Sequence, residues 1–415
     1  MSGHDTAAHR PGPAEVSTGT STTLRGARLL ANCATLTFDP QAQSTCWPWW
    51  YWTRPDHERV VELLRGAPRL AGPLADVARA PRDMAAHGRL CLALDAVLNE
   101  RSWPAGELTA ALEVIERSAR IGLHLGEELA AQPAVEPMTV GQILSGMAGA
   151  GPGPGAASTR ISVVVPFRAD DPHDGRARNL AACLAGLTDQ DLPRDRYRIV
   201  VVESAAEPRW RSVIEPHVDR YLFAFNPGPF NKSWAVNCGV VHGGGPDELV
   251  CVLDGDVLPD SDFLSRGEGR FAREPTLQAH WPYRDIIFAD PASSDRAVAH
   301  RCSLGRPAVD HATLRGVFLR RPPGGCVWVR RRLFDQIAGL DERFEGWGGE
   351  DNDFAWRADF VGGIERFGDT LVHLNHARVH SDPSAPPPAR GPDHHWCTWR
   401  PAEPIGDLAK YLPSR

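Results

Sequence analysis

From residue 160 onward, short apolar runs alternate with stretches of helical periodicity. The run 249–253 is apolar at all five positions, which is typical of a strand buried on both faces of a sheet. Strands that alternate with helices predict βαβ units, and therefore an α/β fold with a mostly parallel sheet. We expect strands at 161–168, 199–203, 220–225, 249–253 and 324–329, and helices at 179–187, 232–241, 259–271, 331–337 and 351–360.

The N-terminal part of the chain has a different pattern. Between residues 55 and 131 the apolar positions follow helical spacing, interrupted by Pro and Gly, which predicts several short helices. The preceding aromatic cluster, 47–52, has the composition of a carbohydrate-stacking platform, but large aromatic residues more often fill a core or an interface. We favour a core or an interface, which makes the cluster a candidate contact in a homo-oligomer.

Composition suggests five segments. Residues 1–25 are small and polar and predict a disordered N-terminus, and 26–147 predict a helical accessory domain. The Gly/Pro stretch 148–159 reads as a linker. Residues 160–380 form the α/β domain, in which 280–321 has little clear period and predicts a mobile loop over the site. Residues 381–415 are Pro-rich and predict an extended tail.

Charge and cysteine content exclude several classes of protein. A net charge of −7 and a pI near 6.1 argue against nucleic acid or an anionic membrane as a partner. Nine cysteines, without a C-x-x-C pair, predict neither a disulfide framework nor a zinc cluster. No signal peptide and no membrane span are recognisable, so we expect a cytoplasmic protein. The preference for arginine, alanine and proline over lysine and isoleucine is typical of a GC-rich bacterial genome.

Two aspartates directly follow the predicted strand 249–253. In the Asp-x-Asp motif formed by Asp254 and Asp256, both carboxylates emerge at the carboxyl end of the strand, where open α/β sheets bind their ligands. Paired carboxylates suit Mg²⁺ or Mn²⁺. A solvated turn with an Asx hydrogen bond is the alternative interpretation of the motif alone.

A second acidic group follows a glycine-rich loop. Glycines at 346, 348 and 349 precede Glu350, Asp351 and Asp353, where a predicted helix begins and its dipole favours carboxylates. Helix capping needs only one such acid. An ionised carboxylate held at this point is suited to act as a general base.

Two histidines three positions apart, His373 and His376, end a probable strand. Near a carboxylate site they are candidate ligands for Mn²⁺. The pair His394 and His395 in the tail lacks companion ligands at a recognisable spacing, so we do not expect it to bind a metal.

These motifs together resemble the GT-A fold, family 2-like glycosyltransferases, in particular the inverting β-galactosyltransferases of the Golgi and bacterial chondroitin-type polymerases. The resemblance covers about residues 160–380. It rests on the ordered blocks 165–168, 230–232 with 237–239, 254–256, 324–325, 347–351 and 373/376.

The resemblance implies an enzyme that uses Mn²⁺ or Mg²⁺ and a nucleotide-sugar donor, with a UDP-sugar favoured over a GDP- or dTDP-sugar. It implies that Asp351 is the catalytic base and Glu350 an acid that binds the acceptor. The implied metal ligands are Asp254, Asp256, His373 and His376. The residues implied for donor and nucleotide binding are Pro166, Phe167, Arg168, Glu203, Asn231, Lys232, Asp254, Gly325 and Trp347.

The hypothesis is therefore a metal-dependent inverting hexosyltransferase that acts on a small soluble acceptor, such as a secondary metabolite, or on a glycan. A retaining GT-A transferase and a capsule-type polysaccharide polymerase are alternative enzymes. A nucleotidyltransferase would have a Gly-rich phosphate loop near the first strand, which 167–171 is not. A sugar-binding module without catalysis is the non-enzyme alternative.

Overall fold

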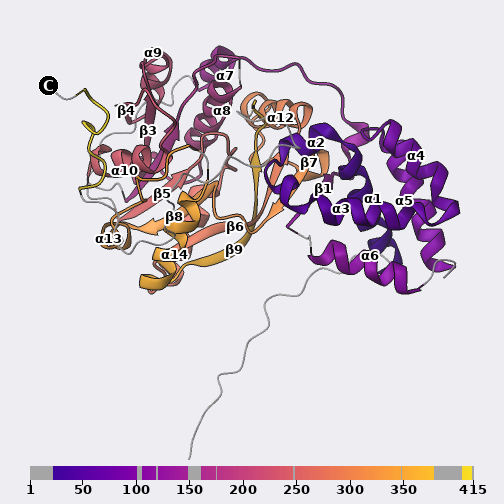
Figure 1. Ribbon diagram of the computed structural model, residues 1–415. Coiled ribbons are helices and arrows are strands. Elements are labelled where there is room, and N and C mark those ends of the chain that lie inside the picture. Colours follow the sequence, from indigo (N-terminus) through magenta and orange to yellow (C-terminus); the bar gives the residue numbers. More distant parts are fainter. Residues whose placement is uncertain are drawn as a thin grey trace, which may run out of the picture.

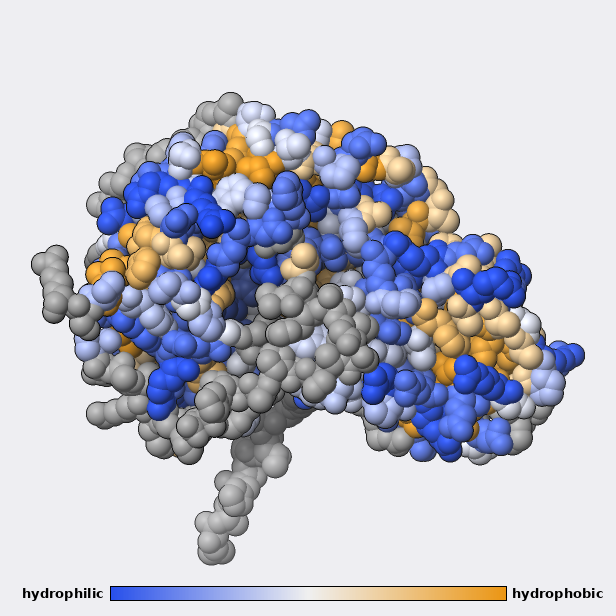
Figure 2. Space-filling model, turned by 45° about the horizontal axis from the view of Figure 1, so that its top comes forward, coloured by the Kyte–Doolittle hydropathy of each residue, from blue (hydrophilic) through white to orange (hydrophobic). Residues whose placement is uncertain are grey.

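The computed structural model describes residues 22–100, 105–117, 120–147, 160–173, 175–245, 248–346, 348–377 and 404–413. The predicted linker 148–159 and the tail histidines lie outside these residues, as does nearly all of the segment predicted to be a disordered N-terminus. Figure 1 shows two parts side by side, the N-terminal helices and an α/β part. In the space-filling view, hydrophilic residues cover much of both parts, and apolar residues gather in smaller groups (Figure 2).

The first part is helical, as its apolar spacing predicts. Buried side chains such as Leu30, Leu64 and Leu94 form a core of their own, because each helix turns one apolar stripe toward its neighbours. The helices are α1 (Thr22–Phe38), α2 (Pro40–Thr45), α3 (Trp49–Arg65), α4 (Ala71–Arg79), α5 (Met84–Asn99) and α6 (Ala105–Arg117).

The second part is built on a nine-stranded sheet, counted over the described residues, with the order β1-β7-β6-β8-β5-β2-β3-β4 and β9 paired to β6. Strands β2 to β5 are mutually parallel, which confirms the α/β fold class. The later strands β6, β7 and β8 join antiparallel, whereas β9 runs parallel to β6. The strands are β1 (Ile121–Leu125), β2 (Ile161–Phe167), β3 (Tyr197–Ala205), β4 (Arg220–Phe225), β5 (Leu249–Leu253), β6 (Ala279–Ala289), β7 (Arg315–Arg320), β8 (Cys326–Arg330) and β9 (Glu365–His373).

Helices cover both faces of this sheet (Figure 1). Because side chains alternate along a strand, Val163 and Val165 pack in one core with α8, whereas Val164 packs in the other with α10. The α-helices of this part are α7 (Val140–Gly146), α8 (Arg176–Thr188), α9 (Arg211–Ile214), α10 (Lys232–His242), α11 (Phe263–Arg273), α12 (Pro291–Val298), α13 (Arg331–Gln336) and α14 (Glu350–Gly362). Short helical turns are η1 (Pro68–Leu70), η2 (Leu129–Ala131), η3 (Arg194–Arg196), η4 (Glu215–His217), η5 (Ala299–Ser303) and η6 (His311–Thr313).

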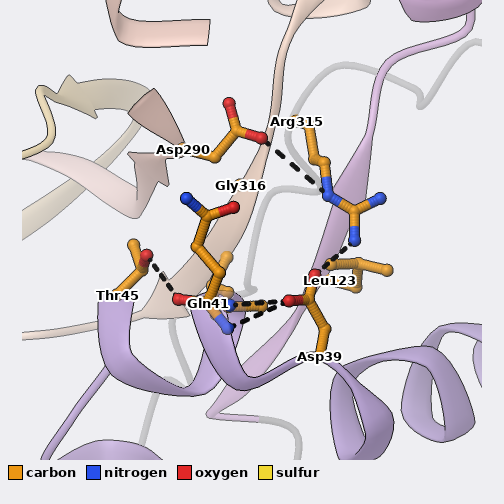
Figure 3. Close-up of a pocket in the computed structure, with 9 residues that line it drawn as sticks. Asp39, Gln41, Thr45, Leu123, Asp290, Arg315 and Gly316 are labelled. Carbon is orange, nitrogen blue, oxygen red and sulfur yellow. Dashed lines mark hydrogen bonds and ion pairs between the residues drawn. The ribbon is translucent and has the colours of Figure 1, made fainter. Parts of the chain in front are cut away.

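The two parts are joined by a shared strand and by a buried ion pair. Residues 121–125, which we expected to be helical, form β1 and pair antiparallel with β7. Beside this pairing, Asp39 accepts a 2.6 Å hydrogen bond from Arg315, and Asp290 lies 4.0 Å from the same guanidinium (Figure 3). The N-terminal helices are therefore fixed to the antiparallel end of the sheet.

The prediction of a mobile loop at 280–321 is wrong. This stretch contains β6, α12 and β7, and β6 lies in the middle of the antiparallel half. Register shifts between Trp281 and Tyr283, and between Tyr283 and Asp285, interrupt the pairing of β6 with β9. Such bulges break the two-residue alternation by which a strand is recognised in a sequence.

The end of the predicted extended tail is packed. The Asp407 carbonyl accepts a 2.9 Å hydrogen bond from the indole of Trp234, and the hydroxyl of Tyr411 accepts one from Asn231. Residues 404–413 thus pack on α10, without forming a helix or strand of their own. Within the described ranges, none of the helices has the length and apolar character needed to cross a membrane.

Candidate active site

A cavity of about 850 Å³ opens at the carboxyl ends of β2 and β5. Since parallel strands place their carboxyl ends at one edge of a sheet, residues that follow β2 and β5 meet here. Eleven of the fourteen predicted site residues line this cavity: Pro166, Phe167, Arg168, Lys232, Asp254, Asp256, Gly325, Glu350, Asp351, His373 and His376.

Asp256, His373 and His376 form a candidate metal centre. The two carboxylate oxygens of Asp256 lie 3.2 Å from Nε2 of His373 and 3.2 Å from Nε2 of His376. One ligand atom from each residue lies within 4.8 Å of the others, and no second such group occurs among the residues that the structure describes. Asp254 is not part of this group, and its role as a metal ligand stays a prediction.

The donor set fits a divalent cation. Nδ1 of His373 lies 2.9 Å from the Leu374 carbonyl, and Nδ1 of His376 lies 2.8 Å from the Ala377 carbonyl. If each Nδ1 donates its proton to that carbonyl, both Nε2 lone pairs face the Asp256 oxygens, and a cation between them removes the repulsion. Oδ1 of Asp256 is buried and accepts no hydrogen bond from the described residues. One carboxylate and two imidazoles suit Mn²⁺ better than Ca²⁺.

Burial alone would raise the pKa of Asp256, but His373 and His376 in their protonated form outweigh it and hold that pKa far below its usual range. Asp256 is therefore ionised at any physiological pH, as a metal ligand must be.

Backbone hydrogen bonds place β9 beside the aspartate turn. The amide of Leu374 donates to the Asp256 carbonyl at 2.8 Å, and Leu258 donates to Val372 at 3.0 Å. Asn179 of α8 then donates to the Asn375 carbonyl at 3.0 Å, which supports the loop that carries His376. The centre therefore combines segments more than 100 residues apart in the sequence.

Lys232 occupies the other side of the cavity. Its ammonium lies 2.9 Å from Asp254 and 3.2 Å from Asp351. Burial disfavours the charge, but these carboxylates and Glu350 raise the pKa of Lys232 well above its usual value. Lys232 therefore stays protonated, and it neutralises part of the negative charge beside the metal centre.

Asp351 stands at the first turn of α14, where the helix dipole favours a carboxylate. The loop before it turns through left-handed backbone at Gly348 and Gly349, a conformation that glycine adopts without strain. A Cβ atom on Gly324 would lie 2.2 Å from Oδ2 of Asp351. The carboxylate of Asp351 can therefore occupy this position only because residue 324 has no side chain.

Glu350 is buried beside the same group. Burial first, and the charge of Asp351 second, raise the pKa of Glu350 to about 8. Lys232 lies 3.8 Å away, beyond hydrogen-bond distance, and it is already paired with the two aspartates. Glu350 is accordingly protonated at neutral pH and can donate a hydrogen bond.

The structure does not bring two of the predicted residues, Glu203 and Asn231, into the cavity. Glu203 is buried and accepts hydrogen bonds from the hydroxyl of Tyr221 and from the amide of Trp210. Asn231 is the N-cap of α10, where it accepts from the amide of Trp234 at 2.8 Å. Trp347 lies outside the described residues.

The cavity also contains residues that the motifs did not indicate. Arg176 lines it and donates to the carbonyl of Ala377 at 3.1 Å. Phe288 packs its ring 4.5 Å from that of His373. Trp49 and Trp52 of the N-terminal part also line the cavity, and only the aromatic composition of 47–52 could have indicated them. Trp47 and Trp50 are buried, as the core interpretation predicts.

Two family models match consecutive parts of the α/β part. Residues 162–337 match glycosyl transferase family 2, and residues 319–380 match a second model described as the N-terminal domain of galactosyltransferase. No curated protein matches the sequence significantly.

Solved structures of low similarity include a mannosyltransferase from Pyrobaculum calidifontis in complex with GDP-Man and Mn²⁺, at 19% identity and a TM-score of 0.36. TarS of S. aureus matches at 13% identity and a TM-score of 0.37. A third match is glucosyl-3-phosphoglycerate synthase from Mycobacterium tuberculosis in complex with Mn²⁺, UDP and phosphoglyceric acid, at 14% identity and a TM-score of 0.35. The matches cover 60%, 52% and 59% of this chain and 61%, 37% and 77% of those chains, so this chain spans less than two thirds of the first two.

The two family matches are consecutive, and together they span residues 162–380, the stretch that contains most of the sheet.

Proposed function

We propose that residues 162–380 form a GT-A domain and that this protein is a metal-dependent, inverting glycosyltransferase, which moves a sugar from a nucleotide-sugar donor to a hydroxyl of a small soluble acceptor. The observation that carries the proposal is that a single cavity is lined by both Asp351 and the group of Asp256, His373 and His376. A UDP-sugar is the favoured donor, on the motif resemblance described above. A cytoplasmic location is part of the proposal, since the eight described cysteines are all free.

Asp256, His373 and His376 would hold Mn²⁺ or Mg²⁺, which supplies charge stabilisation for the leaving diphosphate. Lys232 and Arg176 add positive charge to the same cavity. The positive charge of these two side chains favours the breaking of the bond between the sugar C1 and the phosphate oxygen. The electron pair of that bond leaves on the nucleoside diphosphate.

Asp351 accepts the proton of the acceptor hydroxyl as that oxygen forms its bond to C1. Attack from the face opposite the leaving group inverts the anomeric configuration. The ammonium of Lys232, 3.2 Å from Asp351, orients the carboxylate. Protonated Glu350 is positioned to donate a hydrogen bond to the acceptor.

Donor hydrolysis tests this proposal without knowledge of the acceptor, because water can take the place of the acceptor hydroxyl. We expect one donor from a panel of UDP-, GDP- and dTDP-sugars to be hydrolysed with Mn²⁺ or Mg²⁺ and not with chelator. NMR should detect the inverted anomer first. Asp351→Asn should still bind the donor but should hydrolyse it about 10²- to 10⁴-fold more slowly.

The matched control is Asp359→Asn, which changes an exposed aspartate at the other end of α14 and should leave hydrolysis unchanged. An active Asp351→Asn enzyme would disprove the role of the base. Release of the retained anomer would identify a retaining enzyme. Donor binding without any turnover would favour a sugar-binding module.

A further inference from the structure

Three tryptophans from outside the GT-A domain reach its cavity. Trp47, Trp49 and Trp52, named here the aromatic wall, line the cavity together with Asp351 and the metal centre. The side chain of Trp52 is 44% exposed although it is a large apolar group. Its ring lies 5.3 Å from that of Trp49, at an angle of 71°.

The segment that carries the wall is anchored in the core. Trp50 is 2% exposed, and its ring lies 5.3 Å from that of His57. Trp49 and Trp52 are three positions apart on α3, so they lie side by side on one face of the helix. The indoles of Trp49 and Trp52 are therefore presented to the cavity by a fixed helix.

Strand pairing ties the wall to the catalytic part. Leu319 of β7 lines the same cavity and pairs with Ile121 of β1, and α2 is fixed by the ion pair of Asp39 with Arg315 (Figure 3). The wall is thereby held at the antiparallel end of the sheet. The aspartate turn and Arg168, by contrast, follow the parallel strands β5 and β2.

This division matches the needs of two substrates. A nucleoside diphosphate needs the cation site and the positive charges of Lys232 and Arg176. The aromatic wall carries no charge. The face of an indole contacts the C–H bonds of a ring that stacks on it, and it also attracts cations. In the cavity as a whole, carboxylates outnumber guanidinium and ammonium groups. A bound divalent cation and a diphosphate would roughly cancel, so the surplus negative charge disfavours an anionic second substrate.

We propose that Trp49 and Trp52 are the binding platform for the acceptor, and that the acceptor presents a neutral or cationic carbohydrate or cyclitol ring. This inference rests on the proposed function, because it assigns the second substrate of that site. It also gives the N-terminal helices a role, which is to supply acceptor specificity to the GT-A domain.

The test measures acceptor and donor binding separately. Methyl glucoside, methyl glucosaminide and methyl glucuronide serve as neutral, cationic and anionic probes, measured by ligand-observed NMR with Mn²⁺ and nucleoside diphosphate present. The variants are Trp49→Ala, Trp52→Ala and Trp52→Phe. The control is Trp356→Ala, which removes a 56% exposed tryptophan that does not line the cavity.

We expect the neutral or cationic probe to bind the native chain and Trp356→Ala equally. Binding should be about three- to tenfold weaker in Trp49→Ala and Trp52→Ala, with most of it retained in Trp52→Phe. The glucuronide should bind weakest to every variant. Donor binding and metal-dependent donor hydrolysis should be the same in all variants.

Four results would overturn the inference while donor hydrolysis persists. In the first two, no probe binds, or the glucuronide binds best. In the other two, the wall variants weaken donor binding instead of probe binding, or a native dimer dissociates in Trp52→Ala. The last would identify the wall as a subunit interface. Loss of metal-dependent donor hydrolysis from the native chain itself would instead refute the proposed function, so the two failures are distinguishable.

Discussion

The buried pair of Asp39 and Arg315 provides a quantitative test of how the N-terminal helices are attached. The side chains are 3% and 8% exposed, and their closest atoms are 2.6 Å apart across 276 positions of sequence. Removal of one partner from a buried pair costs about 3–5 kcal/mol, because the other charge remains buried.

The structure indicates that Asp39→Asn should cost somewhat less than that range. Asp290 lies 4.0 Å from Arg315 and remains as a partial partner, although it also pairs with Arg82 at 2.8 Å. The amide oxygen of asparagine can still cap α2, whose amides at Gln41 and Ala42 now donate to Asp39. We therefore expect Asp39→Asn to cost about 2 kcal/mol, and Asp39→Ala about 1 kcal/mol more, because alanine also removes the cap.

Urea unfolding of the full chain, followed by circular dichroism, measures these free energies. The control is Asp83→Asn, which changes an exposed helix cap on α5 and should cost less than about 0.5 kcal/mol. If Asp39→Asn cost no more than Asp83→Asn, the pair would not anchor the N-terminal part. The double variant Asp39→Leu with Arg315→Met should recover part of the loss, because it removes both charges of the pair, although it also removes the cap of α2.

Three further predictions concern the site itself. Gly324→Ala should slow donor hydrolysis at least about tenfold, because its Cβ would meet Oδ2 of Asp351 at 2.2 Å; an unchanged rate would show that the carboxylate can move freely. His376→Ala should weaken Mn²⁺ binding at least about tenfold in a competition titration with a metal indicator, and equal affinity would exclude His376 as a ligand. The pKa of Glu350, raised to about 8 first by burial and then by Asp351, makes a contribution to stability that is complete below its ordinary value of 4.5 and is lost as the pH rises through 8. Between pH 5 and pH 9 the native chain should therefore lose about 4 kcal/mol relative to Glu350→Gln, and parallel urea-unfolding curves would contradict the buried, protonated carboxyl.

Interpretation of the motifs succeeded where the information is local. The apolar run 249–253 and the acids behind the glycine loop predicted β5 and the first turn of α14, because burial and helix capping act on neighbouring residues. The bulged strand β6 was missed, because its register shifts remove the alternation. β1 was missed as well, because its pairing partner β7 lies almost 200 residues further along the chain.

The sequence by itself determined the class of the domain and most of the residues around its cavity, because these stand at the ends of predicted strands and helices. Only the tertiary structure decided how they divide. It placed Asp256 with His373 and His376, and Asp254 with Lys232, because both pairings depend on contacts between distant segments. It also brought Trp49 and Trp52 into the cavity, since the position of an N-terminal helix relative to the sheet is set by strand pairing and a buried ion pair. Neither of those contacts is visible in the residues near the tryptophans.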